Sequence, residues 1–172
     1  MIAAGIVAAA AAAIVGGILI AANAGNVSDD EAEKKNEDSQ KQVEETKKVL
    51  EAADAWKEKN EALDAAAQEY DELSKKTNRT IEEEERLKEL QEDITKQMPE
   101  LIEKYKELGE ALGEDWSSDI AAIEEHLATG NTEAAIKAEE ELEDKANAAT
   151  AKSAAEGMTA QAYSVAYKMR DK

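Results

Sequence analysis

Residues 49–73 read VLEAADAWKEKNEALDAAAQEYDEL, and the apolar spacing within this stretch decides the fold class. Val49, Trp56, Leu63 and Tyr70 recur every seven residues, which corresponds to two turns of an α-helix. No Pro or Gly interrupts the pattern. The stretch therefore predicts a long amphipathic helix with a narrow apolar seam.

A second row of positions is offset from the first by three residues. It begins at Ala52, and Lys59 interrupts it. The predicted coiled-coil seam consists of Val49, Trp56, Leu63, Ala66, Tyr70 and Leu73. Ser28 is followed directly by acidic residues, which is a start signal for a helix. We therefore expect one long charged helix within residues 25–75.

Helix signals continue along the rest of the chain. Thr80 and Glu83 form a capping-box pattern after a polar turn, and Pro99 and Gly113 are residue types that end or kink helices. The predicted segments are shorter helices broken at Pro99 and Gly113 in residues 76–130, and an Ala-rich C-terminal helix in residues 131–172. The predicted fold class is all-α, an elongated coiled coil or helical hairpin behind a hydrophobic N-terminal helix.

Ile2–Ala22 is an unbroken apolar run of 21 residues. At about 1.5 Å per residue, a helix of this length crosses roughly 30 Å of hydrocarbon. Residues 1–24 are therefore predicted to form a membrane-type helix rich in Ala and Gly. The residues expected to pack it against lipid or another helix are Gly5, Ala9, Ala13, Ile14, Gly17, Ile18 and Ala21, of which the small ones recur every fourth position.

Three other interpretations of this run stay open. Ala22-Asn23-Ala24 fits a signal-peptide cleavage pattern, but no Lys or Arg precedes it, and the apolar stretch exceeds the usual length of about 7 to 15 residues. The run also suits the buried core helix of a bundle, or a low-complexity helix that never meets a bilayer. The flanking charges do not predict its orientation in a membrane.

The rest of the chain is strongly acidic. Asp and Glu number 40 against 21 Lys and Arg, which gives a net charge of −19. Such a field repels nucleic acid, so we expect no specific DNA or RNA binding. The chain has no Cys, which excludes disulfides and thiolate metal sites.

No catalytic or cofactor motif stands out in the sequence. His126 is the only histidine, and Ala122 and Gly130 one turn away offer no second metal ligand. Gly-rich phosphate loops and nucleophile elbows are absent, and carboxylate pairs are too common in so acidic a chain to be informative. We therefore expect no enzyme activity, no catalytic residue, no cofactor, no metal site and no small-molecule substrate.

The order of the segments resembles that of a known family. An Ala- and Gly-rich apolar helix precedes a long charged helix ending in YDELSKKTNRT (residues 70–80), and then come Ile81, an acidic run to Arg86-Leu87, Leu90 and Pro99-Glu100-Leu101-Ile102. From Ile2 to about Tyr105, this arrangement is similar to an internal stretch of the tail tape measure proteins of tailed phages and prophages. The family has no set of functional residues to carry over.

The resemblance implies a non-enzymatic virion structural protein, present in several copies inside the tail tube, whose length sets the length of the tail. It also implies exit from the tube on genome ejection, when apolar segments enter the host membrane and help DNA to pass. The implied partners are copies of the same chain, other tail proteins and, through residues 2–22, the membrane. Because 172 helical residues span at most about 260 Å, we expect a fragment or truncated relative of an intact ruler.

The alternative is a single-pass bacterial membrane protein whose acidic helices form a scaffold that binds protein partners. A third interpretation is a helical bundle with the Ala-rich helix as its core. Neighbouring genes separate the first two interpretations, since genes for a tail tube, an assembly chaperone and a baseplate accompany a tape measure protein.

Overall fold

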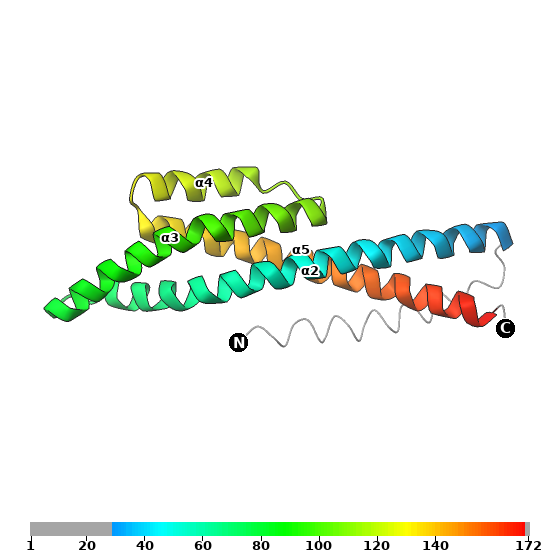
Figure 1. Cartoon of the computed structure of the whole chain (residues 1–172), viewed down its shortest axis with the longest axis horizontal. Coiled ribbons are helices and arrows are strands. Elements are labelled where there is room, and N and C mark those ends of the chain that lie inside the picture. The colour runs from blue at the N-terminus through cyan, green and yellow to red at the C-terminus, as the bar shows by residue number, and fades with distance from the viewer. Residues whose placement is uncertain (1–28, 171–172) are drawn as a thin grey trace. The chain divides into compact units, whose positions relative to one another are not determined.

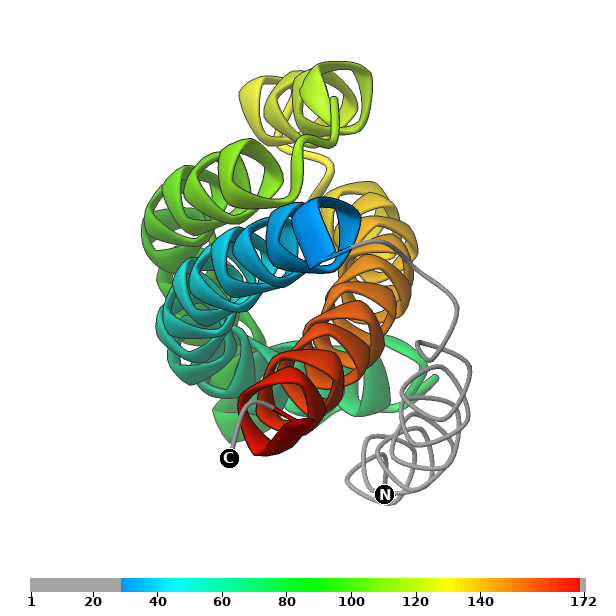
Figure 2. The same ribbon diagram turned by 90° about the vertical axis from the view of Figure 1, so that its right-hand side faces the viewer.

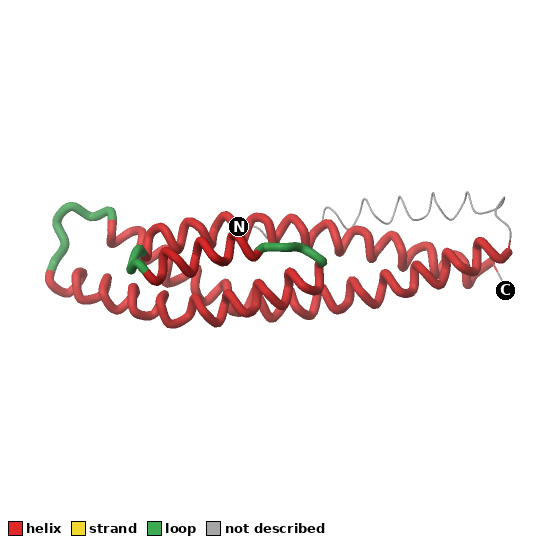
Figure 3. The backbone as a smooth tube through the Cα atoms, turned by 90° about the horizontal axis from the view of Figure 1, so that it is seen from above, coloured by secondary structure: helices red, strands yellow, loops and turns green. Residues whose placement is uncertain are grey.

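The computed structural model describes residues 29–170. These residues form four helices, α2 (Asp29–Ser74), α3 (Ile81–Leu112), α4 (Ser117–Ala128) and α5 (Thr132–Arg170) (Figure 1). Within residues 29–170 the chain contains only helices and the loops that join them, and no strand (Figure 3). The all-α prediction is confirmed for this part of the chain.

The predicted membrane-type helix lies outside the described residues, and so do Gly5, Ala9, Ala13, Ile14, Gly17, Ile18 and Ala21. Among the four helices that are described, none combines the length and the apolar character that a bilayer-spanning segment needs. The membrane assignment of Ile2–Ala22 thus stays a prediction.

The described chain divides into two compact units. Unit 1 contains the first part of α2, residues 29–51, and the last part of α5, residues 148–170. Unit 2 contains residues 52–147, and therefore the remainder of both long helices together with all of α3 and α4.

Side chains near the α2–α3 turn satisfy the free backbone groups at the helix ends. Thr80 Oγ1 accepts the Glu83 N–H at 3.2 Å while the Glu83 carboxylate accepts the Thr80 N–H at 3.0 Å, which confirms the predicted capping box. Arg79 donates to the carbonyl oxygens of Leu73 and Ser74 at the end of α2. A cation there also faces the negative end of the helix dipole.

Helix α3 ends at Gly113 as predicted, but it continues through Pro99, so the predicted break at Pro99 is wrong. Gly113 adopts a left-handed conformation with φ 71°, which favours glycine. Pro99 removes the N–H that would bond the Thr95 carbonyl. Thr95 and Pro99 both lie on the exposed side of α3, where water can bond that carbonyl, and buried Met98 and Leu101 hold the helix on either side.

In unit 2, α2 and α3 run antiparallel. Lys59 pairs with Glu100 at 2.8 Å, and Glu69 pairs with Arg86 at 2.7 Å, so residue numbers rise along one helix as they fall along the other. These pairs are exposed and contribute little to stability. The core between the helices of unit 2 contains Trp56, Leu63, Leu90, Ile94, Met98, Leu101, Ile102, Tyr105, Leu108, Trp116, Ile120, Ile123, Ile136 and Leu142.

The apolar seam of α2 differs from the prediction in its second row. Val49, Trp56 and Leu63 are buried, as the heptad spacing predicts. The second buried row is Ala53, Asn60 and Ala67, one residue further along than expected, whereas Ala52, Ala66, Tyr70 and Leu73 are only half-buried. Residues three and four positions apart share a helix face. Here the step from Val49 to Ala53 is four residues, and the step from Ala53 to Trp56 is three. Lys59 therefore does not interrupt the seam, and Asn60 is part of it.

In unit 1, α2 and α5 run antiparallel, and the start of α2 and the end of α5 both face the viewer in Figure 2. Thr46 Oγ1 donates to the Ser153 carbonyl oxygen at 3.4 Å, and Lys35 Nζ lies 4.8 Å from the centroid of the Tyr163 ring. The buried residues of this unit are mostly small or polar: Ala32, Asn36, Ser39, Thr46, Val49, Ala160, Tyr163 and Ser164.

The close approach of the two helices in unit 1 depends on Gly157. A Cβ atom at this position would lie 2.4 Å from Cγ2 and Oγ1 of Thr46 and 2.6 Å from its Cβ. Because the Thr46 Cβ itself is too near, rotation of the threonine side chain cannot relieve the contact. Gly157 therefore fixes how closely α2 and α5 pack at this level.

Candidate functional site

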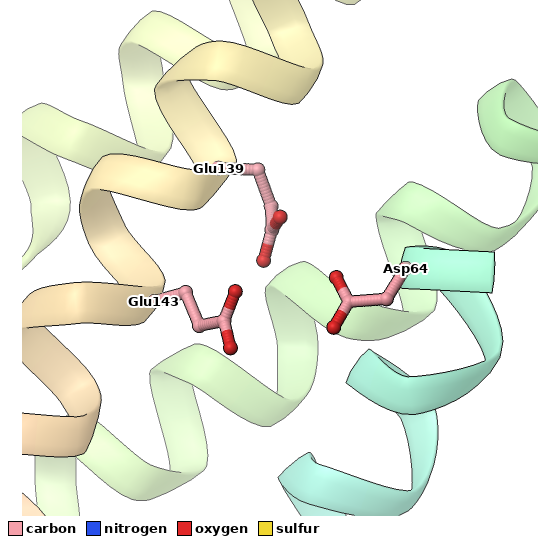
Figure 4. A group of neighbouring side chains, drawn as sticks. All are labelled: Asp64, Glu139 and Glu143. Carbon is pink, nitrogen blue, oxygen red and sulfur yellow. The ribbon is translucent and has the colours of Figure 1, made fainter. Parts of the chain in front are cut away.

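Three carboxylates from two helices meet in unit 2. Asp64 projects from α2, and Glu139 and Glu143 project from α5 toward it (Figure 4). One carboxylate oxygen from each lies within 4.8 Å of the others. Glu139 is 2% exposed, while Asp64 and Glu143 are half-buried and reach solvent. In the described part of the chain, no Lys or Arg forms an ion pair with any of the three.

Glu139 also forms a hydrogen bond with Tyr105 of α3. The Tyr105 hydroxyl donates to Glu139 Oε1 at 2.5 Å. The Tyr105 ring also packs between two tryptophans, with its centroid 5.5 Å from that of Trp56 and 6.3 Å from that of Trp116. Aromatic packing on both sides fixes the ring, so the hydroxyl has a defined direction toward Glu139.

Burial and mutual repulsion make the charged forms of these acids unfavourable. The pKa of Glu139 is raised to about 8, chiefly by burial and to a smaller extent by the nearby Glu143, Asp64 and Glu140, while the Tyr105 hydrogen bond opposes the rise. Burial and then Asp64 raise the pKa of Glu143, while burial and then Glu61 raise that of Asp64. Burial and Glu139 together raise the pKa of Tyr105, which therefore stays a hydrogen-bond donor.

Asn60 lies beside this cluster. It sits one helical turn before Asp64, so the two side chains share a face of α2. Asn147 Nδ2 donates to Glu143 Oε1 at 3.4 Å, and Asn147 and the nearby Asn60 side chain both lower the pKa of that carboxyl. Asn60 is 3% exposed, and its Oδ1 has no hydrogen-bond partner.

The sequence analysis missed this cluster because acidic residues are so abundant. One signal was present in the spacing: Ala135, Glu139, Leu142 and Ala146 are all buried and follow each other at intervals of four, three and four. Glu139 thus occupies a core position of α5, as Asn60 does in α2. A polar residue at a core position is a stronger indication of a site than a carboxylate pair on a solvated face.

The other residues considered from the sequence lie apart from the cluster. His126 is half-buried in the last turn of α4. The predicted seam supplies Trp56, through its contact with Tyr105, but the carboxylates come from neighbouring positions. Asp115 lies one residue before Trp116, the N-cap of α4, and its Oδ1 accepts from the N–H and the hydroxyl of Ser117.

Unit 1 carries a second feature, an apolar groove of about 410 Å³ between α2 and α5. Its lining includes Val43, Leu50, Ala151, Ala154, Ala155 and Met158. Leu50 and Met158 are 42% and 37% exposed, and Val165 and Met169 extend the exposed apolar face along α5 at helical spacing. Several larger apolar side chains of unit 1 thus lie on its surface, whereas its interior, apart from Val49 and Tyr163, consists of small and polar residues.

Comparison with protein-family models, with curated proteins and with solved structures finds no match to this chain.

Proposed function

We propose that this chain is a non-enzymatic helical scaffold that associates with membranes through Ile2–Ala22, and that the groove of unit 1 holds this segment when no bilayer is present. The observation that carries the proposal is the arrangement of apolar residues in unit 1. Leu50, Met158 and Val165 are exposed, while mostly small and polar residues, with Val49 and Tyr163, fill the space between α2 and α5. An exposed apolar face of this kind favours coverage by another apolar helix.

Length and connection favour Ile2–Ala22 as the occupant. Six residues separate Ala22 from Asp29, the first residue of α2. A helix of 21 residues spans about 32 Å, which is also about the distance along α2 from Asp29 to Leu50. A segment that turns back along α2 would therefore pass the groove, and the short link gives it a high effective concentration there.

The chemistry of the segment agrees with this placement. Its small residues at every fourth position allow close contact with another helix, and the groove offers alanines and the flexible Met158. Eight strongly apolar residues favour membrane insertion by only a few kcal/mol in total. A modest apolar groove can therefore compete with lipid for the segment, and added bilayer shifts the balance.

Cross-linking tests the proposed occupant, and the absence of native Cys makes engineered pairs unambiguous. Ala9→Cys with Val43→Cys places one thiol on the segment and one in the groove. The control, Ala9→Cys with Glu45→Cys, moves the second thiol to an exposed position on the opposite side of α2. We expect an intramolecular disulfide for the first pair in dilute solution, little for the control, and a decrease when phosphatidylcholine vesicles are added.

Two results of this experiment would contradict the proposal. Equal disulfide yields for the two pairs would mean that the segment does not select the groove. Disulfides that form only between chains would assign the groove to the segment of a second copy.

Tail tape measure activity is the second candidate function, and it rests on the resemblance between Ile2 and about Tyr105. A ruler needs its helices laid end to end, whereas Thr46 contacts Ser153 and Lys59 pairs with Glu100. This function therefore requires the antiparallel helices to separate inside a tail tube. Tail tube, assembly chaperone and baseplate genes beside this one would support it, and other neighbours would favour the scaffold.

A further inference from the structure

The carboxylate cluster of unit 2 has the composition of a cation site. Asp64, Glu139 and Glu143 converge within 4.8 Å, and none of them is neutralised by a Lys or Arg in the described residues. When all three groups are ionised, they repel one another strongly, because they are close together and Glu139 is buried. A bound cation would remove that repulsion.

Asn60 provides a second and independent indication of a ligand. Its side chain is almost fully buried beside Glu143, and its amide oxygen has no hydrogen-bond partner. Buried amide oxygens in proteins are normally satisfied, and leaving one unpaired costs about 1–3 kcal/mol. Rotation of the amide about the Cβ–Cγ bond would bring this oxygen toward Glu143, where a cation at the cluster would take it as a ligand.

We propose that Asp64, Glu139, Glu143 and the Oδ1 atom of Asn60 bind one hard divalent cation such as Ca²⁺, Mg²⁺ or Mn²⁺. The donor set contains only oxygen, with no His or Cys, and carboxylate and amide oxygens suit these ions rather than Zn²⁺ or Cu²⁺. The half-buried Asp64 and Glu143 leave a route for the ion from solvent.

Tyr105 has a supporting role in this site. Its hydroxyl donates a hydrogen bond to one carboxylate oxygen of Glu139, and its ring packs against Trp56 and Trp116. Hydrogen bonds of this kind orient carboxylate ligands toward a metal. The ligands come from two helices, so the cation would tie α2 to α5 within unit 2. It would stabilise the folded state by an amount that rises with the logarithm of the free cation concentration above Kd.

Calorimetric titration of the chelator-treated full chain with CaCl₂ and with MnCl₂ tests the site. The disabling variant is Asp64→Asn with Glu143→Gln, which leaves the Tyr105–Glu139 bond in place. The matched control, Asp54→Asn with Glu141→Gln, removes the same charges from exposed positions on the same two helices. We expect saturable binding of one ion by the native chain and the control, and a loss in affinity of at least roughly a hundredfold in the disabling variant.

Thermal unfolding of the same proteins separates loss of binding from loss of folding. The disabling variant is expected to melt cooperatively and to show no rise in Tm with cation, because removal of two like charges does not disrupt packing. Weak, unsaturable binding that is equal in all three proteins would overturn the proposal, since it would reflect only the acidic surface.

Asn60→Leu tests the fourth ligand. Leucine fits an apolar seam position, so this variant should fold while its affinity for the cation decreases about tenfold. Native affinity in Asn60→Leu would show that the buried amide sets helix register alone and is not a ligand.

Discussion

Tyr105 on α3 and Glu139 on α5 are joined by a hydrogen bond in the interior of unit 2, with 2.5 Å between the hydroxyl oxygen and Oε1. Both side chains are almost fully buried. A carboxyl group in such a place is unfavourable unless polar partners surround it. The bond supplies one partner, and the carboxyl group faces Asp64 and Glu143 (Figure 4).

Tyr105→Phe is expected to lower the free energy of unfolding by about 1–3 kcal/mol, because it leaves Glu139 buried without its donor while the ring still packs against Trp56 and Trp116. Urea unfolding at pH 7, followed by tryptophan fluorescence, measures the change. Tyr70→Phe, at a half-buried position of α2, is the control and should change stability by less than about 0.5 kcal/mol. Equal effects of the two substitutions would show that the buried bond contributes nothing.

Glu139→Gln is expected to reduce the pH dependence of stability that the native chain shows between about pH 5 and 8. The pKa of Glu139 is about 8 in the folded protein against an ordinary 4.5, so the folded state holds an extra proton between these values. The stability of the native chain therefore decreases as pH rises through this range. The ionisable groups that act on this carboxyl are Tyr105, Glu143, Asp64 and Glu140.

Urea unfolding from pH 5 to pH 9 with chelator present measures this difference. At pH 8.5 the free energy of unfolding of Glu139→Gln should exceed that of the native chain by about a few kcal/mol, the order of magnitude that such a pKa shift implies. The exposed Glu141→Gln is the control. A constant difference between Glu139→Gln and the native chain at every pH would contradict the assignment.

Gly157→Ala is expected to destabilise unit 1, although Ala in a helix interior is normally favoured over Gly by about 1 kcal/mol. The added Cβ would lie 2.4–2.6 Å from Thr46, so α2 and α5 must separate, at a cost of about 1–3 kcal/mol. Thermal melting followed by circular dichroism measures the effect. The exchange variant Thr46→Gly with Gly157→Ala moves the small residue from α5 to α2 and should recover most of the lost stability. A Gly157→Ala protein that is as stable as the native chain would contradict the close contact.

Thr80→Ala is expected to lower the free energy of unfolding by about 0.5–2 kcal/mol, because the Glu83 N–H at the start of α3 loses its acceptor. Thr77→Ala, an exposed substitution in the same turn, is the control. If both variants unfold at the same urea concentration, the capping box is not a determinant of stability.

Local signals predicted the helices and most of their ends. The capping box at Thr80 and the left-handed Gly113 are determined within one or two turns of chain, and the structure has both. Pro99 was misleading because its local effect favours a helix end, while its position on the exposed face and the burial of Met98 and Leu101 outweigh that effect.

The candidate site depends on contacts that sequence spacing does not reveal. Asp64 and Glu139 are far apart in the chain, and only the packing of α2 against α5 in unit 2 makes them neighbours. The predicted second row of the seam passes through Lys59, one residue before the buried Asn60, so the prediction left Asn60 outside the seam. With the correct register, a buried Asn and a buried Glu on facing helices would have indicated the cluster.

We propose that Ile2–Ala22 moves from the groove of unit 1 into lipid when a bilayer is present, and vesicle flotation tests this most directly. The native chain and a control with an exposed apolar residue of unit 2 removed, Ile81→Ser, are expected to float with phosphatidylcholine vesicles, since this position lies outside both the segment and the apolar face of unit 1. Ile14→Ser with Ile18→Ser is expected to stay at the bottom of the gradient, because insertion is favoured by only a few kcal/mol. A native chain that remains at the bottom, or a double serine variant that floats as well as the native chain, would contradict the account.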